Sequence, residues 1–270
     1  MNRSQAARDL SSEKRQTTMK AFPHEFSELL TSRGTSILTR SAKNSSGLFV
    51  DQKKYFVTLD GVIKKGKARD CVSLLDEQLY GHLRVEQRKI PRESITGMTE
   101  NYEEVLNKTM RIKTAFLRSS NSRSYRAAEK IGLLAMMRSD SFLAFAESLT
   151  GLPLDEDPGI QVSCYEHGDY VGPHNDHHPE DAELKNGYVD FHVMFTNRSV
   201  AHHYLVYESG GHFSRIVDLN IQGGISIYKL PFWHYTTPLE AKPDHELEAR
   251  RWLLLGTFRI REASLTETAS

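Results

Sequence analysis

The segment from residue 165 to residue 178 reads YEHGDYVGPHNDHH and holds four histidines and two aspartates. Within it, His174 and Asp176 are two residues apart, and on a strand this spacing puts both side chains on the same face. Imidazole nitrogens and carboxylate oxygens are ligands for divalent metal ions, and the carboxylate offsets part of the ion's charge. The pair therefore predicts two ligands of a metal site that needs a third ligand from elsewhere in the chain.

We expect the third ligand to be His234 in PFWHYTTPL, because it follows the strand-like run GISIYKL and β connections can return it to the first two. Two imidazoles and one carboxylate leave neighbouring coordination positions open, an arrangement typical of non-haem Fe(II) oxygenases. His245 is a rival third ligand, but it lies among charged residues rather than at a strand end.

The chain has 12 histidines, and 10 of them lie beyond residue 160, so enrichment alone does not identify ligands. His192 alternates with apolar neighbours in DFHVMF. A position facing a pocket and a packed, hydrogen-bonded position are both open for it. Solvated loop or surface positions are expected for the remaining members of this half, namely His167, His177, His178, His202, His203 and His212.

The overall charge of the 270-residue chain is balanced, with 35 lysines plus arginines and 35 aspartates plus glutamates. No global field therefore attracts nucleic acid or an anionic membrane. The sequence has no run of about 18 apolar residues and no apolar signal-peptide core. Two cysteines, Cys71 and Cys164, are too few for a disulfide framework. We expect a cytoplasmic protein without a nucleic-acid or membrane partner; the oligomeric state is left open.

The period of the apolar pattern changes from 3.6 to 2 near residue 159. The runs that follow are short, rich in β-branched and aromatic residues, and separated by turn residues. They lie at 160–165, 188–195, 202–209, 214–221, 224–230 and 251–260. Such a rhythm predicts an antiparallel sandwich or barrel.

The part of the chain before residue 159 favours helices. Short amphipathic helices are expected at 24–32 and 69–82 around a strand at 53–63, and the charged segment 85–112 has no clear assignment. A pair of packed helices is expected within 122–150, where polar caps precede each apolar stripe and Gly151 ends the second. The predicted organisation is a disordered arm at 1–20, an α/β extension packed on the core at 21–114, a core with support helices at 115–261, and a tail at 262–270.

Three segments, CYEHGDYVGPHND, FWHYTTPL and RRWLLLGTFRI, occur in this order and resemble the Fe(II)- and 2-oxoglutarate-dependent dioxygenases, within them the prolyl-4-hydroxylase-like branch. The resemblance covers about residues 115–261. It implies an α+β protein with a mainly β core, a double-stranded β-helix (jelly roll) with supporting N-terminal helices. It also implies Fe(II) as cofactor, 2-oxoglutarate and O₂ as cosubstrates, and stimulation by ascorbate.

The same resemblance implies site residues. His174, Asp176 and His234 match the three iron ligands. Arg251 matches the basic residue that binds the distal carboxylate of 2-oxoglutarate, and Tyr165 matches a tyrosine that helps to bind the same carboxylate.

The spacing from His234 to Arg251 is longer than in this branch, so EAKPDHELEA is expected to be an inserted loop. This leaves Arg250 and Arg259 as alternatives to Arg251. Arg251 is favoured because it opens an apolar strand, from which its guanidinium can point inward and bind a carboxylate through two hydrogen bonds.

The reaction implied by the resemblance is hydroxylation of an unactivated C–H bond, with release of succinate and CO₂. A small metabolite or free amino acid is the favoured substrate, because no peptide-docking module is visible, and a prolyl or other protein side chain is the alternative. A cupin-like metal-dependent hydrolase or isomerase and a non-catalytic jelly-roll binding protein are rival classes. A buried cation opposite the metal would separate the oxygenase from the hydrolase or isomerase, and the non-catalytic protein would bind no stoichiometric metal.

Overall fold

The computed structural model describes residues 19–39, 56–90, 108–176 and 187–261. Almost all of the expected arm at 1–20 and the whole tail at 262–270 lie outside these residues. No helix in the described part of the chain is long and apolar enough to cross a membrane.

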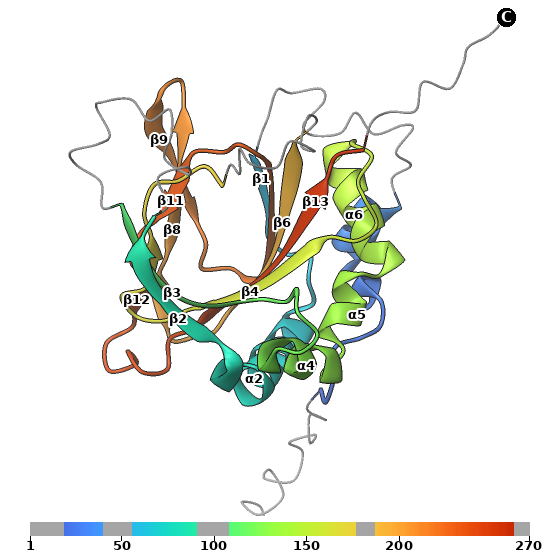
Figure 1. Ribbon diagram of the computed structural model, residues 1–270, viewed down its shortest axis with the longest axis horizontal. Helices are drawn as coiled ribbons and strands as arrows, with labels where there is room; N and C mark the ends of the chain where they lie inside the picture. The colour runs from blue at the N-terminus through green and yellow to red at the C-terminus, as the bar shows by residue number, and fades with distance from the viewer. Residues whose placement is uncertain (1–18, 40–55, 91–107, 177–186, 262–270) are drawn as a thin grey trace, which may run out of the picture.

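A curled antiparallel sheet of eight strands forms most of the molecule (Figure 1). Seven strands follow one another across it, and β5 pairs separately with β3. In spatial order they are β1 (Phe56–Leu59), β10 (Gln222–Lys229), β6 (Tyr188–Thr196), β13 (Arg251–Arg259), β4 (Gly159–Tyr165), β3 (Thr109–Phe116) and β2 (Arg84–Lys89), with β5 at Tyr170–Val171. The sheet curls into a half-barrel, so its inner face can surround a ligand.

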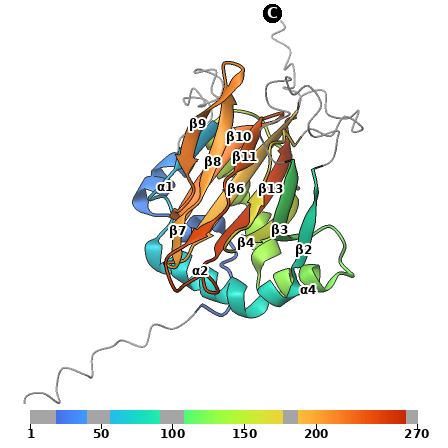
Figure 2. The same cartoon turned by 90° about the vertical axis from the view of Figure 1, so that its left-hand side faces the viewer.

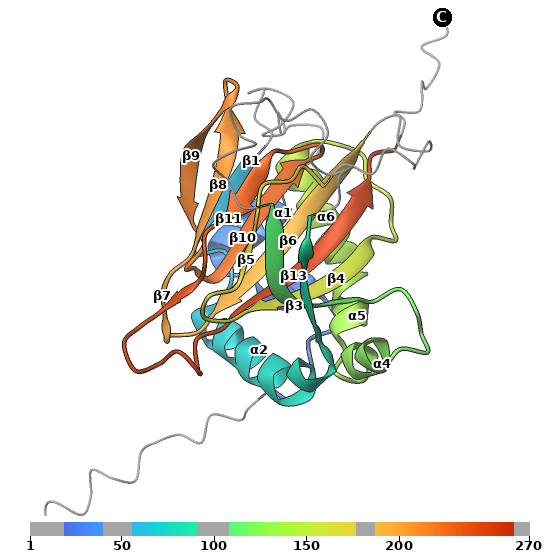
Figure 3. The same cartoon turned by 60° about the vertical axis from the view of Figure 1, so that its left-hand side comes forward.

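Two smaller antiparallel sheets complete the β structure. One has the order β11 (His234–Thr236), β8 (Tyr204–Ser209) and β9 (His212–Asp218); the other pairs β12 (Glu240–Ala241) with β7 (Val200–His202). The β8–β9 hairpin extends beyond the large sheet in every view (Figure 3). The expected α+β class with a mainly β, jelly-roll core is confirmed.

The helices cover the outer, convex side of the large sheet (Figure 1). They are η1 (Phe26–Leu29), α1 (Ser32–Leu38), α2 (Lys65–Gln78), η2 (Tyr80–His82), α4 (Arg123–Lys130), α5 (Leu133–Met137) and α6 (Asp140–Thr150). α2 crosses beneath the strands (Figure 2), where Asp76 accepts a 2.8 Å hydrogen bond from the indole nitrogen of Trp252 on β13.

Helix α6 begins and ends where its sequence indicates. The Ser139 side chain accepts a hydrogen bond from the Phe142 backbone N–H, and Gly151 closes the helix with a φ of 70°. Such a left-handed closing residue favours glycine. Three helices form where a pair is expected. Gly132, with a φ of 75°, separates α4 from the short α5.

Two cores lie on opposite faces of the large sheet. The larger packs helices against the outer face and includes the aromatic rings of Phe26, Phe142, Phe145 and Phe191. The second lies on the inner face of the half-barrel. Since both faces are covered, β13 appears in the sequence as a continuous apolar run rather than an alternating one.

The part of the chain before residue 117 contributes more β structure than its sequence indicates. In the segment 85–112, which has no clear assignment, the described residues belong mainly to β2 and the first half of β3. The expected helix at 24–32 is instead a short 3₁₀ turn followed by α1. β1, β2 and β3 all belong to the large sheet, so strands from both parts of the chain build the half-barrel.

Candidate metal centre and cavity

The two histidines of the expected metal site face each other across an isolated antiparallel bridge. The backbone N–H of His174 donates to the His234 carbonyl at 3.0 Å, and the reverse bond measures 2.9 Å. Their ring centroids are 4.2 Å apart. His174 follows β5 and His234 begins β11, so backbone pairing rather than side-chain packing sets the distance between the two rings.

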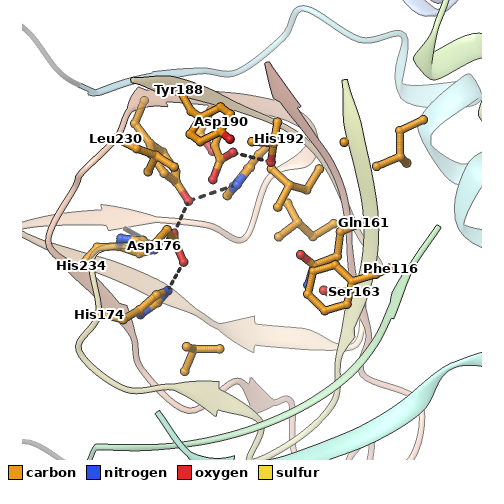
Figure 4. Close-up of a pocket in the computed structure, with 18 of the residues that line it drawn as sticks. Phe116, Gln161, Ser163, His174, Asp176, Tyr188, Asp190, His192, Leu230 and His234 are labelled. Atoms are coloured by element: carbon orange, nitrogen blue, oxygen red, sulfur yellow. Dashed lines mark hydrogen bonds and ion pairs between the residues drawn. The ribbon is translucent and has the colours of Figure 1, made fainter. Parts of the chain in front are cut away.

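The backbone conformation that brings Asp176 to the two imidazoles differs from the expected one. Its φ is 55°, in the left-handed region, so the strand geometry assumed from the two-residue spacing does not extend to it. Aspartate tolerates this conformation better than most residues. The turn brings its carboxylate to 3.2 Å from the Nε2 of His174 and 3.7 Å from the Nε2 of His234 (Figure 4).

Both rings are oriented by backbone carbonyls on their other side. The Nδ1 atom of His174 lies 2.8 Å from the Gly172 carbonyl, and that of His234 lies 2.7 Å from the Phe232 carbonyl. A carbonyl only accepts, so each Nδ1 carries the hydrogen. In the neutral ring, Nε2 is then unprotonated and its lone pair points towards Asp176. A metal ligand requires such a free lone pair.

The donor atoms of these three residues all lie within 4.8 Å of one another, and they form the one such group in the described part of the chain. His245, the rival third ligand, is not in the group. It is half-exposed and its Nδ1 lies 2.9 Å from a carboxylate oxygen of Glu248. The rival assignment is therefore wrong for the described chain, because the loop that carries His245 keeps it on the surface.

The electrostatics of the group suit a divalent cation. Burial alone raises the pKa of Asp176, but the two imidazoles outweigh it and hold the pKa below the ordinary range. Burial and the neighbouring His174 lower the pKa of His234 to about 4. At neutral pH the site therefore offers an ionised carboxylate and at least one neutral imidazole, which are metal-binding forms.

A cavity of about 880 Å³ runs along the inner face of the half-barrel, and the three residues lie in its wall. Strand register arranges its lining in rows across the sheet. At the buried end Arg251 on β13 pairs with Tyr165 on β4, and towards the exposed end Thr257 pairs with Asp190 on β6. Alternate β13 residues (Arg251, Leu253, Leu255, Thr257 and Arg259) line the cavity.

Arg251 is a buried cation at the inner end of this cavity. Arg251 is 2% exposed, and its Nε and Nη1 atoms have no hydrogen-bond partner among the described residues. Its guanidinium carbon lies 5.2 Å from the centre of the Tyr165 ring. Burial lowers its pKa to about 10, which leaves it charged at neutral pH. A buried cation with unused donors requires an anionic partner.

The alternative arginines lie elsewhere. Arg250 points to the opposite face of β13, where its guanidinium lies 4.3 Å from the ring of Tyr80 and near the carboxylates of Asp76 and Glu166. Arg259 lines the exposed end of the cavity, roughly 26 Å from Arg251 along an extended strand. Only Arg251 of the three combines burial with a place at the inner end.

His192 is the one histidine for which two positions were open, and it lines the cavity. Its Nε2 lies 3.2 Å from the hydroxyl of Tyr228, which also lies 3.5 Å from a carboxylate oxygen of Asp176. Burial and the charge of Arg251 lower the pKa of His192 to about 3, so the ring is neutral. Polar contacts through Tyr228 therefore connect the metal ligand Asp176 with His192 on β6.

Two side chains near the site have positions that sequence reasoning did not identify. Asp190 is 3% exposed and lines the cavity, and its Oδ1 accepts a 2.7 Å hydrogen bond from Thr257. Burial and the charge of Asp176 raise its pKa to about 8. An acid in the strand-like run YVDFHVMF, whose other residues are apolar or aromatic apart from His192, was the available signal.

His203 is the second such residue. The surface position expected for it is wrong: it is fully buried, with its ring 4.7 Å from that of Tyr165. Burial and the Arg251 charge hold its pKa well below the ordinary value. Its neighbour His202 ends β7 and is exposed, whereas His203 lies between β7 and β8. His177 and His178 lie outside the described residues.

No protein-family model matches this chain, and no curated protein matches its sequence. Among solved structures, a prolyl hydroxylase from Trichoplax adhaerens, in complex with a hypoxia inducible factor peptide fragment, is 12% identical with a TM-score of 0.50, covering 84% of this chain and 91% of that one. A 2OG-Fe(II) oxygenase family protein from Burkholderia pseudomallei is 13% identical, with a TM-score of 0.45 and coverages of 75% and 84%.

A non-haem alpha-ketoglutarate-dependent carbocyclase from nogalamycin biosynthesis is 11% identical to this chain, with a TM-score of 0.49. The match covers 82% of this chain and 86% of that one. At these identities the matches concern the fold. The prolyl hydroxylase match and the curled sheet agree with each other, so the protein has the jelly-roll fold found in 2OG-Fe(II) oxygenases.

Proposed function

We propose that the protein is an Fe(II)- and 2-oxoglutarate-dependent dioxygenase. The observation that carries the proposal is the buried Arg251 with unused donors at the inner end of the cavity whose wall holds the His174, Asp176 and His234 group. A hydrolase or isomerase with the same ligands has no need of this cation, and a non-catalytic binding protein has no need of the ligand group.

Each residue has a role that its geometry fits. His174 and His234 would hold Fe(II) through their Nε2 atoms, and Asp176 through its carboxylate, which offsets half of the ion's charge. Bound Fe(II) supplies oxidation of a C–H bond by O₂, coupled to the decarboxylation of 2-oxoglutarate to succinate. Arg251 would bind the distal carboxylate of this cosubstrate, assisted by the hydroxyl of Tyr165.

The cavity wall strengthens these interactions. Apolar side chains, including Leu205, Leu219 and Leu253, line the cavity and keep water from the region beside Arg251. An ion pair is stronger in such a region than in water. The fixed neutral His192 adds no competing positive charge, so the carboxylate of the cosubstrate is attracted to Arg251.

We further propose that the outcome is hydroxylation of an unactivated C–H bond, with ascorbate as a stimulant of turnover. A small metabolite or free amino acid is the favoured substrate, and a cavity of about 880 Å³ is in the range of small-molecule sites. A prolyl or other protein side chain is the second candidate, because the Trichoplax adhaerens enzyme is bound to a peptide.

The test is anaerobic reconstitution with Fe(II) and 2-oxoglutarate, monitored by the weak visible charge-transfer band between metal and chelating oxoacid. Wild type is expected to show the band, and His234→Ala is expected to lose it. Arg251→Ala should need at least tenfold more 2-oxoglutarate. Arg250→Ala is the matched control, since it removes an arginine from the opposite face of the same strand and should leave the 2-oxoglutarate dependence unchanged.

The rival classes predict other results. A hydrolase or isomerase would bind one metal ion per chain through His234 but show no band with 2-oxoglutarate. A non-catalytic binding protein would bind no stoichiometric metal, and His234→Ala would change only stability. Absence of the band in iron-loaded wild type would overturn the proposal.

A further inference from the structure

Asp190 lies on the cavity wall between the metal group and the exposed end. Register places it opposite Thr257 of β13 on one side and Tyr228 of β10 on the other. Tyr228 reaches Asp176, and the next row outward holds Tyr188 and Arg259. Figure 4 shows the carboxylate of Asp190 directed into the cavity, beside His192. Asp190 is therefore a carboxylate of the cavity wall close to the metal-ligand residues.

The polar contacts of Asp190 are incomplete. Its Oδ1 accepts a hydrogen bond from the Thr257 hydroxyl. Among the described residues, no lysine or arginine forms an ion pair with Asp190. Asp169 provides a contrast within the same protein. It is equally buried, at 2% exposed, but it lies 3.3 Å from Arg111 and accepts a backbone hydrogen bond from Glu166. A buried carboxylate with a structural role is thus fully paired here, whereas Asp190 is not.

A buried carboxylate without a cation is costly, and the cost is offset when a ligand brings the missing positive charge. In the proposed enzyme the Asp176 charge is matched by the metal ion and the Arg251 charge by the cosubstrate. Asp190 then remains as a cavity acid without a cationic partner among the described residues, and neutral His192 beside it does not offset its charge when it ionises.

We propose that Asp190 is a specificity-determining residue that binds a cationic nitrogen of the substrate, an ammonium or guanidinium group, with Thr257 holding the carboxylate in place. The inference rests on the proposed function in calling this ligand a substrate. The cation would donate charge-assisted hydrogen bonds to Asp190, which fixes where along the molecule the neighbouring C–H bonds lie relative to the metal group.

The test measures binding of n-butylammonium and of its neutral counterpart 1-butanol. The protein is loaded with Zn(II), which occupies the ligand group without redox chemistry, and the measurement is made with and without 2-oxoglutarate. About pH 8.5 keeps the Asp190 carboxylate ionised and the alkylammonium protonated. Calorimetry or ligand-observed NMR should show that wild type binds n-butylammonium at least tenfold more tightly than 1-butanol.

Asp190→Asn should abolish this preference. The asparagine amide oxygen still accepts the Thr257 hydrogen bond, so the fold is retained, and circular dichroism verifies it. Asp157→Asn is the matched control: Asp157 also lines the cavity but is exposed and paired with Arg138 at 2.9 Å, and its loss should leave the preference unchanged. Asp190→Glu should retain a preference for the cation.

Equal binding of the two probes by wild type, or a preference that survives Asp190→Asn, would overturn the inference. Failure of the proposed function has a different signature, because 2-oxoglutarate would then have no effect on the metal site while the ammonium preference remained measurable. The two ideas can therefore fail separately.

Discussion

Two carboxylates in one cavity have opposite pKa shifts. Asp176 and Asp190 are both buried, and burial raises the pKa of each. The two imidazoles beside Asp176 reverse its shift, whereas Asp190 has a hydroxyl and the nearby negative charge of Asp176. One site thus holds an ionised metal ligand and an acid that retains its proton to about pH 8.

The shift of Asp190 predicts how stability depends on pH in the metal-free protein. Between the ordinary aspartate pKa and about 8, the folded protein holds a proton on Asp190 that the unfolded chain has released. Raising the pH in this window therefore lowers the free energy of unfolding, by at most about 1.4 kcal/mol per pH unit. Asp190→Asn removes the effect, so its stability relative to wild type should rise by about 2–4 kcal/mol from pH 5 to pH 8. Urea unfolding of both proteins across this range checks it, and parallel curves would contradict it.

At the scale of elements, strand β13 connects the cavity to the helical layer. Alternate side chains from Arg251 to Arg259 face the cavity, and Trp252, Leu254 and Phe258 are buried in the core on the other face. Gly256 lies on this outer face, where the ring of Phe142 from α6 packs directly over it. The outer face of β13 is thus in close contact with α6 at Gly256.

Gly256→Ala is expected to destabilise this contact. A Cβ atom at Gly256 would lie 2.9 Å from a ring carbon of Phe142, and that ring is held by Phe191 and Phe258. Overpacking of a core contact costs about 1–3 kcal/mol. The control is Gly159→Ala on the neighbouring strand β4, where the new atom would meet nothing closer than 3.8 Å. Urea unfolding should show a loss for the first variant and little change for the second.

At the scale of the whole molecule, the metal group joins the two larger sheets. His174 follows β5, which pairs with β3 of the large sheet, and His234 begins β11 of the three-stranded sheet. The described chain holds one ligand group, so a single ion would link both sheets through their ends. Metal binding should therefore be visible as a change in global stability.

Zn(II) or Fe(II) at about one hundred times its dissociation constant should stabilise the fold by about 2.7 kcal/mol, or about 5–10 °C in the melting temperature. His234→Ala should melt at the same temperature with and without metal. His245→Ala should respond like wild type, because His245 lies at the surface. A metal response that is lost in His245→Ala and kept in His234→Ala would contradict the assignment of the ligands.

Much of the fold and of the ligand set could be predicted from local patterns. Period-2 apolar runs indicated the longer strands β4, β6, β8, β9, β10 and β13 but not the short β5, β11 and β12, and the capping residues Ser139 and Gly151 marked the ends of α6. β2 was missed because it is an edge strand exposed along most of its length, so its residues show no apolar alternation. The sequence by itself therefore determined the longer strands with an apolar pattern and left the charged edge strand β2 undefined.

The sequence also determined which side chains could bind a metal, since the residue types of His174, Asp176 and His234 and their places near strand ends are local facts. Only the tertiary structure decided that a backbone bridge and a left-handed residue bring the three together. It alone decided that Asp190 faces the cavity and that His203 is buried. The reason is physical: the direction of a strand side chain, inward or outward, depends on register against strands distant in the sequence, and that pairing exists only in the folded chain.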